Sequence, residues 1–234
     1  MTLTWTVEPR WGEFEERLNR FAARVRVEGR LYRVYVPNPS RLEELFVPGR
    51  RVLLDRKPAR SARRTPYDLV GVQLKGFLAS VDSRVPNRVL AFGLDHGWFP
   101  FLQGYRIRQA EPTLGQSRLD FLLEGSGRPP LLLETKSCTL VRDGAALFPD
   151  VPTSRGARHL RELQRFLKPE TRAMILWVVQ RPDARYLRPY CEVDPEFCKA
   201  LREAAQAGVE LRAVRLRVTP RELWVEQEIP VQLP

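Results

Sequence analysis

The fold is decided by two apolar stretches, Leu119-Asp120-Phe121-Leu122-Leu123 and Leu131-Leu132-Leu133-Glu134-Thr135-Lys136, joined by the turn Gly125-Ser126-Gly127-Arg128-Pro129-Pro130. Their apolar content predicts strands over residues 117–124 and 131–136, and the short Gly-rich connection predicts a hairpin. Because side chains alternate along a strand, Glu134 and Lys136 share one face while Leu133 and Thr135 point to the other. In such a hairpin Asp120 can reach the face that holds Glu134 and Lys136.

Asp120, Glu134 and Lys136 are the candidate catalytic residues. Two neighbouring carboxylates are unfavourable unless a cation neutralises them, and oxygen ligands select Mg²⁺ or Mn²⁺. We therefore predict Asp120 and Glu134 as metal ligands, with the metal lowering the pKa of a water that attacks a phosphodiester. Lys136 would orient that water or stabilise charge on the phosphoryl oxygens. The alternative is a strand whose polar side chains simply face solvent.

The charge balance favours a polyanion as partner. The 234 residues include 39 Lys and Arg against 28 Asp and Glu, a net charge of +11, which indicates DNA. Arginine, which grips phosphate with a planar fork, greatly outnumbers lysine. A GC-rich or thermophilic source would explain the preference for arginine but not the positive surplus. A carbohydrate ligand for the N-terminal part fits this charge poorly.

Short strands dominate the first third of the chain. Alternation over residues 21–28 and 31–36 around Gly29 predicts a hairpin, and further strands are expected over 51–54, 67–74 and 77–81. Ser40 is expected to cap a short helix over residues 41–46. Five short strands with one short helix are typical of an OB-like β-barrel, which we assign to residues 1–84. The basic segment 56–64 is expected to be a loop that either tracks phosphate or is merely solvated.

Helices and strands alternate in residues 85–234, so a mixed α/β domain is expected there. Helices are predicted over 88–96, 154–167 and 195–207, the last with Asp194 as N-cap, Pro195 at its first position and Gly208 after its end. Residues 173–179 form an apolar run typical of a buried strand, and strands over 210–218 and 223–229 complete the domain.

The sequence has no apolar segment typical of a membrane span and no cysteine spacing typical of a metal site. No run of eighteen apolar residues occurs, and the first ten residues carry no basic leader before an apolar stretch, so a soluble cytoplasmic protein is expected. Cys138, Cys191 and Cys198 are odd in number and lack the pairing of metal ligands. We expect them to be reduced, structural thiols.

The motif residues 117–123 and 134–141 resemble the two central motifs of the sugar fermentation stimulation protein A family. The likeness continues through residues 143–150, 153–163, 178–183 and 193–195, and through Pro37-Asn38 with Arg41 and Pro86-Asn87-Arg88, so it covers nearly the whole chain. It implies an N-terminal OB fold, a C-terminal domain like PD-(D/E)xK nucleases, DNA binding, and a bacterial role in maltose metabolism. By residue match, the superfamily's metal and catalytic positions fall on Asp120, Glu134 and Lys136.

The chain departs from the family pattern at two places. Ala91-Phe92 stand where acidic residues are usual, which leaves a second metal ion open, and Pro39-Ser40 replace the usual Thr-Gly.

Further residues are assigned supporting roles. Positions 155, 158, 159 and 162 share one helix face, and a helix N-terminus with arginines suits a DNA phosphate. His159 is interpreted as a phosphate contact, a general acid or a core residue. Asp150 would hold waters or cap a turn, and Gln180, at the end of a buried strand, would lie beside the site. The predicted nucleic-acid contacts are Arg41, Arg63, Arg64, Arg118, Arg155, Arg158 and His159.

These patterns predict a DNA-binding protein with a Mg²⁺- or Mn²⁺-dependent nuclease-like site that hydrolyses phosphodiester bonds. The alternative is a non-enzymatic DNA-binding regulator of sugar metabolism. Strand preference and oligomeric state stay open.

Overall fold

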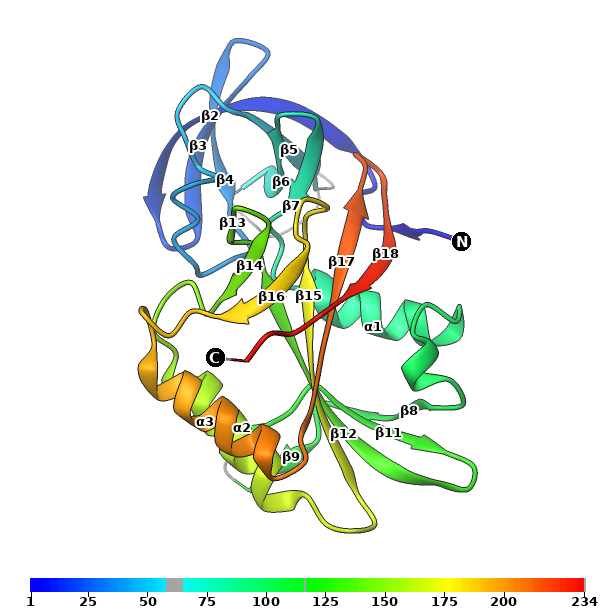
Figure 1. The fold of residues 1–234 in the computed structure, drawn as a ribbon. Helices are drawn as coiled ribbons and strands as arrows, with labels where there is room; N and C mark the ends of the chain where they lie inside the picture. The colour runs from blue at the N-terminus through cyan, green and yellow to red at the C-terminus, as the bar shows by residue number, and fades with distance from the viewer. Residues whose placement is uncertain (58–64, 116, 234) are drawn as a thin grey trace.

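A small barrel and a larger layered α/β unit make up the computed structural model, which describes residues 1–57, 65–115 and 117–233 (Figure 1). The predicted mixed α/β class with an N-terminal OB-like barrel is confirmed. No helix in these described ranges is long and apolar enough to cross a membrane.

The barrel closes through a parallel pairing of its first and last ring strands, Tyr35 with Asp68. Around the ring the order is β4-β3-β2-β5-β6, and β7 extends the sheet from β6. Apolar side chains such as Phe14, Val25 and Leu54 fill the interior. The strands are β2 (Pro9–Asn19), β3 (Ala22–Val27), β4 (Arg30–Tyr35), β5 (Arg51–Arg56), β6 (Tyr67–Leu74) and β7 (Phe77–Ser80).

Two details of the barrel differ from the sequence prediction. The strand β2 was not predicted, yet it joins β3 to β5; a Cβ at its Gly12 would lie 2.5 Å from a Val25 methyl carbon, so close strand packing requires glycine there. The helix predicted over residues 41–46 is wrong. Leu42 has φ of +57°, outside the helical region, and the segment forms a turn in which the Leu45 and Phe46 amides donate to the Leu42 carbonyl.

A seven-stranded sheet in the order β1-β18-β17-β15-β12-β11-β8 forms the centre of the second unit. Its middle strands β12, β15 and β17 run parallel. The apolar run of β15 is buried throughout, as predicted. The strands are β1 (Leu3–Thr4), β8 (Arg106–Ala110), β11 (Phe121–Gly125), β12 (Arg128–Cys138), β15 (Arg172–Val179), β17 (Glu210–Val218) and β18 (Glu222–Ile229).

The N-terminal residues belong to this sheet rather than to the barrel. Leu3 pairs with Leu223 across β1 and β18, and the Trp5 indole donates to the Thr219 carbonyl at 2.8 Å. The assignment of residues 1–84 to one barrel unit stays a prediction, and these contacts tie its first residues to the second sheet. The division after residue 84 stays a prediction; the helix α1 begins at Val85.

Helices cover both faces of the sheet (Figure 1). The helix α1 (Val85–Asp95) packs with Leu133 and Leu176 on one face, in a core that also reaches into the barrel. The helices α2 (Ser154–Phe166) and α3 (Pro195–Gln206) pack on the other face. The remaining short elements are η1 (Pro100–Leu102), β9 (Thr113–Leu114), β10 (Ser117–Arg118), β13 (Val141–Arg142), β14 (Ala145–Phe148) and β16 (Tyr186–Pro189).

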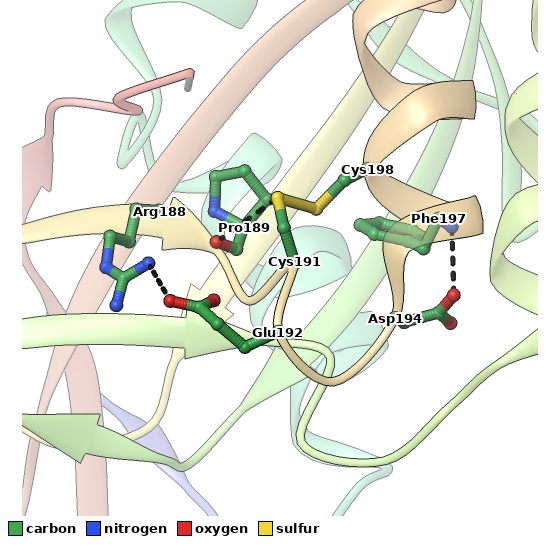
Figure 2. The surroundings of a disulfide bond; sticks show 7 residues. All are labelled: Arg188, Pro189, Cys191, Glu192, Asp194, Phe197 and Cys198. Atoms are coloured by element: carbon green, nitrogen blue, oxygen red, sulfur yellow. Dashed lines mark hydrogen bonds and ion pairs between the residues drawn. A yellow bond between two sulfur atoms is a disulfide. The ribbon is translucent and has the colours of Figure 1, made fainter.

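A disulfide joins Cys191 and Cys198, so the prediction of three reduced thiols is wrong for this pair (Figure 2). Cys191 follows β16 and Cys198 lies in the first turn of α3, which brings their Cα atoms to 5.5 Å. The enclosed Asp194 caps α3, as predicted, by accepting from the Phe197 amide at 2.9 Å. Cys138 is a buried free thiol.

Removing the disulfide is expected to lower the free energy of unfolding by about 2–3 kcal/mol, because closing even a short loop restricts the unfolded chain. Denaturant unfolding of the Cys191→Ser/Cys198→Ala variant measures this. Reductant should destabilise the wild type by a similar amount and leave the double variant unchanged. Equal stability of the reduced and oxidised wild type would contradict the prediction.

Candidate active site

The hairpin of β11 and β12 brings the two candidate acids together. Phe121 pairs with Leu133, so Asp120, which directly precedes β11, lies level with Glu134. The strand predicted over residues 117–124 is interrupted here. Asp120 lies in a bend between β10 and β11, where its carbonyl accepts from the Glu111 amide.

Glu134 is 3% exposed and carries its polar contacts on a single oxygen. Lys136 Nζ and His159 Nδ1 each lie 2.5 Å from Glu134 Oε1. The contact with Lys136 confirms that these two side chains share a face. The other oxygen, Oε2, is buried and has no hydrogen-bond partner within the described part of the chain.

Asp120 is held through Thr135, the residue between Glu134 and Lys136. Its Oδ2 accepts from the Thr135 amide at 2.8 Å and from the Thr135 hydroxyl at 2.9 Å, and its Oδ1 accepts from Asn87 Nδ2 at 3.0 Å. The Thr135 hydroxyl also contacts Asn87 Oδ1. Asp120 therefore lies beside Glu134, as the hairpin predicts, and its carboxylate is held by the Thr135 amide and hydroxyl and by Asn87.

The two carboxyl groups have pKa values shifted in opposite directions. Burial, and then the charge of Glu134, raise the pKa of Asp120, and hydrogen bonds from Asn87 and Thr135 only partly oppose this. Burial also acts to raise the pKa of Glu134, but the charge of Lys136 and the contacts with His159 outweigh it, so this pKa is lowered.

The residues present fit a divalent cation. The buried, unpartnered Glu134 Oε2 and the adjacent Asp120 carboxylate offer hard oxygen donors. No cluster of three or more His, Cys, Asp or Glu side chains suited to a metal occurs among the described residues. Asp120 and Glu134 would therefore be the side chains that hold a metal here, and a pair of carboxylates suits Mg²⁺, which usually keeps several waters.

Comparison with known proteins places the chain in a family. The family model described as the sugar fermentation stimulation protein RE domain matches residues 84–222, more than half of the chain. The chain belongs to the sugar fermentation stimulation protein (SfsA) family. The family's N-terminal OB domain matches residues 16–81, in agreement with the barrel.

Relatives of the SfsA family align over nearly their full length. The sugar fermentation stimulation protein homolog of Moorella thermoacetica is 45% identical, over 94% of this chain and 95% of the relative. The homolog of Pyrobaculum islandicum is 37% identical, over 95% and 94%. The solved structure of Pyrococcus furiosus SfsA in complex with Ca²⁺ is 34% identical, with a TM-score of 0.91 over 99% of both chains.

The predicted DNA contacts of this SfsA chain are spread over both units. Arg155 and Arg158 are exposed on α2, Arg118 is exposed in β10 beside Glu111, and Arg41 is exposed on the barrel beside Glu43. His159 differs from the prediction of a phosphate contact because its side chain is buried against Glu134. Arg63 and Arg64 lie outside the described residues.

Asp150 and Gln180 lie at the junction of the two units. Asp150 accepts from the Ser40 hydroxyl of the barrel at 3.1 Å, and burial raises its pKa. Gln180 is buried, donates to Ser137 Oγ at 2.7 Å, and its carbonyl accepts from the Ser80 amide. These contacts join the barrel to the sheet, and they do not reach Asp120 or Glu134.

Asn87 and Thr135 are site residues that the sequence patterns do not predict. Asn87 stands within the Pro-Asn-Arg motif, and strand alternation places Thr135 on the face opposite Glu134. Their hydrogen bonds to Asp120 depend on how α1 packs against β12, which strand alternation does not predict. The Asn87 position within a family motif was the one available signal.

Asp120→Asn is expected to stabilise the metal-free protein at neutral pH by about 0.5–2 kcal/mol. Folding raises the pKa of Asp120, so its charged form weakens the fold above the unfolded pKa, and the penalty shrinks as the pH falls. Denaturant unfolding in EDTA measures this as a difference from wild type that is present at pH 7 and absent at acid pH. Glu134→Gln is the matched control and should destabilise at pH 7, because the pKa of Glu134 is lowered. Destabilisation by Asp120→Asn would contradict the argument.

Proposed function

We propose that this SfsA chain binds DNA and hydrolyses phosphodiester bonds with Mg²⁺ or Mn²⁺ held by Asp120 and Glu134. The observation that carries this is the buried Glu134 Oε2, which has no hydrogen-bond partner in the described residues. A buried polar oxygen without a partner is costly, and a cation would satisfy it. The Ca²⁺ complex of the Pyrococcus furiosus relative supports a divalent-cation site, since Ca²⁺ and Mg²⁺ both select oxygen ligands.

The chain's own residues have distinct parts in this proposal. When bound, the metal would supply a water of lowered pKa and neutralise phosphate charge. Lys136 uses one ammonium donor on Glu134 and keeps two others, which can contact a phosphoryl oxygen. Thr135 and Asn87 fix the Asp120 carboxylate before any substrate arrives, which favours catalysis because little reorganisation is then needed.

The surface beside the site supports DNA as the substrate. The helix α2 carries His159 inward to Glu134, and its first turns present Arg155 and Arg158 to solvent. A helix N-terminus with exposed arginines favours a phosphate group. The net charge of +11 favours the same class of partner.

One observation favours the second candidate function, a non-enzymatic DNA-binding regulator of sugar metabolism. Lys136 closes an ion pair with Glu134 at 2.5 Å, so the charge of Glu134 is balanced without any metal. In that case Mn²⁺ would change neither DNA binding nor stability, and DNA would stay intact.

Incubation with single- and double-stranded DNA, with Mn²⁺ or with EDTA, tests the enzymatic proposal. Cleavage should require the metal, and Lys136→Met should slow it by about 10²- to 10³-fold, the range for loss of one preorganised electrostatic contact. Glu134→Gln should slow it at least as much. Cleavage by Glu134→Gln at the wild-type rate would rule out this site, and binding without cleavage by folded wild type would favour the regulator.

DNA binding itself is tested by its dependence on salt. Arg158→Gln should weaken binding to all sequences and reduce the slope of log affinity against log salt by about one unit, because one phosphate contact is lost. The control is Arg212→Gln, which removes a half-exposed arginine that pairs with Glu228 across β17 and β18. If both variants showed the salt dependence of the wild type, Arg158 on α2 would not be a DNA contact.

A further inference from the structure

His159 connects the exposed start of α2 to the buried Glu134 carboxylate. We propose that it is a positioning residue, whose Nδ1–H donates to Glu134 Oε1 and so leaves Oε2 available to bind a cation. The inference rests on the proposed function for the presence of a metal. The hydrogen bond between His159 and Glu134 does not depend on that function.

Two donors converge on the same oxygen of Glu134. Lys136 comes from the same strand, two residues away, and His159 comes from α2, 25 residues away, each at 2.5 Å from Oε1. Rotating the carboxylate would break both hydrogen bonds at once. The arrangement therefore fixes which oxygen is left without a partner in the described structure, and this is Oε2.

Arg155 determines which nitrogen of His159 carries the proton. Its Nε lies 3.3 Å from His159 Nε2, at the i, i+4 spacing of one helix face. A guanidinium can only donate, so Nε2 must accept. The ring proton that is donated to Glu134 is then on Nδ1. The order of donation is Arg155 to His159 to Glu134.

The start of α2 is anchored firmly enough to hold the ring in place. The Thr153 side chain caps α2 by accepting from the Gly156 amide at 3.0 Å, and the Thr153 amide donates to Asp194 Oδ2 at 2.7 Å. Asp194 lies in the loop that the Cys191–Cys198 disulfide closes. The starts of α2 and α3 are therefore fixed to each other.

A direct role in chemistry does not fit this environment. The His159 side chain is 2% exposed and both ring nitrogens are engaged. It therefore does not touch a substrate and acts through Glu134. Hydrogen bonds to metal-ligating groups commonly change metal affinity or activity by about 10- to 100-fold.

Two substitutions at His159 separate positioning from packing. In His159→Asn the amide nitrogen can take the place of Nδ1, whereas in His159→Gln it reaches the place of Nε2. Mn²⁺ affinity, measured by calorimetry on the full chain, should fall about 10- to 100-fold in His159→Gln, and His159→Asn should restore most of it. DNA cleavage should follow the same order, and unfolding temperatures of both variants show whether the fold is intact.

The outcomes separate this inference from the proposed function. If Glu134→Gln binds Mn²⁺ like the wild type, the metal site itself is refuted. If Glu134→Gln loses Mn²⁺ while His159→Gln binds it normally, the metal site stands and the positioning role is overturned. Equal losses in both His159 variants, in step with their unfolding temperatures, would also overturn it in favour of packing.

The tautomer gives a test that needs no metal. The chain has two histidines, so His96→Gln, which changes an exposed residue at the end of α1, leaves one imidazole for ¹⁵N NMR. The spectrum should show a protonated Nδ1 and an unprotonated Nε2. Arg155→Ala in the same background should shift the ring toward a mixture of tautomers. A proton on Nε2 with Arg155 intact would refute the proposed donation.

Discussion

Burying the Glu134 carboxylate in β12, one of the parallel strands in the middle of the sheet, constrains the rest of the C-terminal unit. An unpaired charge at this depth would be strongly destabilising, so Lys136 must lie on the same face and α2 must bring His159 within hydrogen-bonding distance. A register slip of one residue in β12 would turn Glu134 toward the apolar core around α1. The contacts of Glu134 therefore favour one register of β12, and that register places Glu134 on the face of α2.

The barrel contributes to the site through α1. Arg84, directly before α1, donates to Asp82 at 2.6 Å and to the barrel residue Asp68 at 3.1 Å, and these contacts, with that to Asp82 first, raise its pKa. Three residues later Asn87 donates to Asp120. The position of one candidate metal ligand thus depends on how the barrel holds the first turn of a helix, which gives the OB unit a structural role besides any ligand that it binds.

The sequence predicts those parts of the fold that depend on interactions between residues close together in the chain. The apolar runs around Glu134 and over β15, the turn after Leu123 and the Asp194 cap of α3 all act within a few residues. The strand β2 was missed because its outward charges hide the alternation. Its role depends on β3 and β5, which pair with it from elsewhere in the chain. The bonds of Asp120 to Asn87 and of Glu134 to His159 likewise join separate elements, so only packing brings them together.

The opposite pKa shifts of Asp120 and Glu134 give the two carboxylates different electrostatic roles. Lys136 balances the charge of Glu134, so the pKa of Glu134 is lowered although the side chain is buried. Burial, and then repulsion by Glu134, raise the pKa of Asp120, which receives only neutral donors from Asn87 and Thr135. The charge that the fold leaves uncompensated is therefore that of Asp120, whereas the oxygen left unpaired in the described structure is Oε2 of Glu134. A divalent cation held by both residues would meet both demands, one electrostatic and one of hydrogen-bonding capacity.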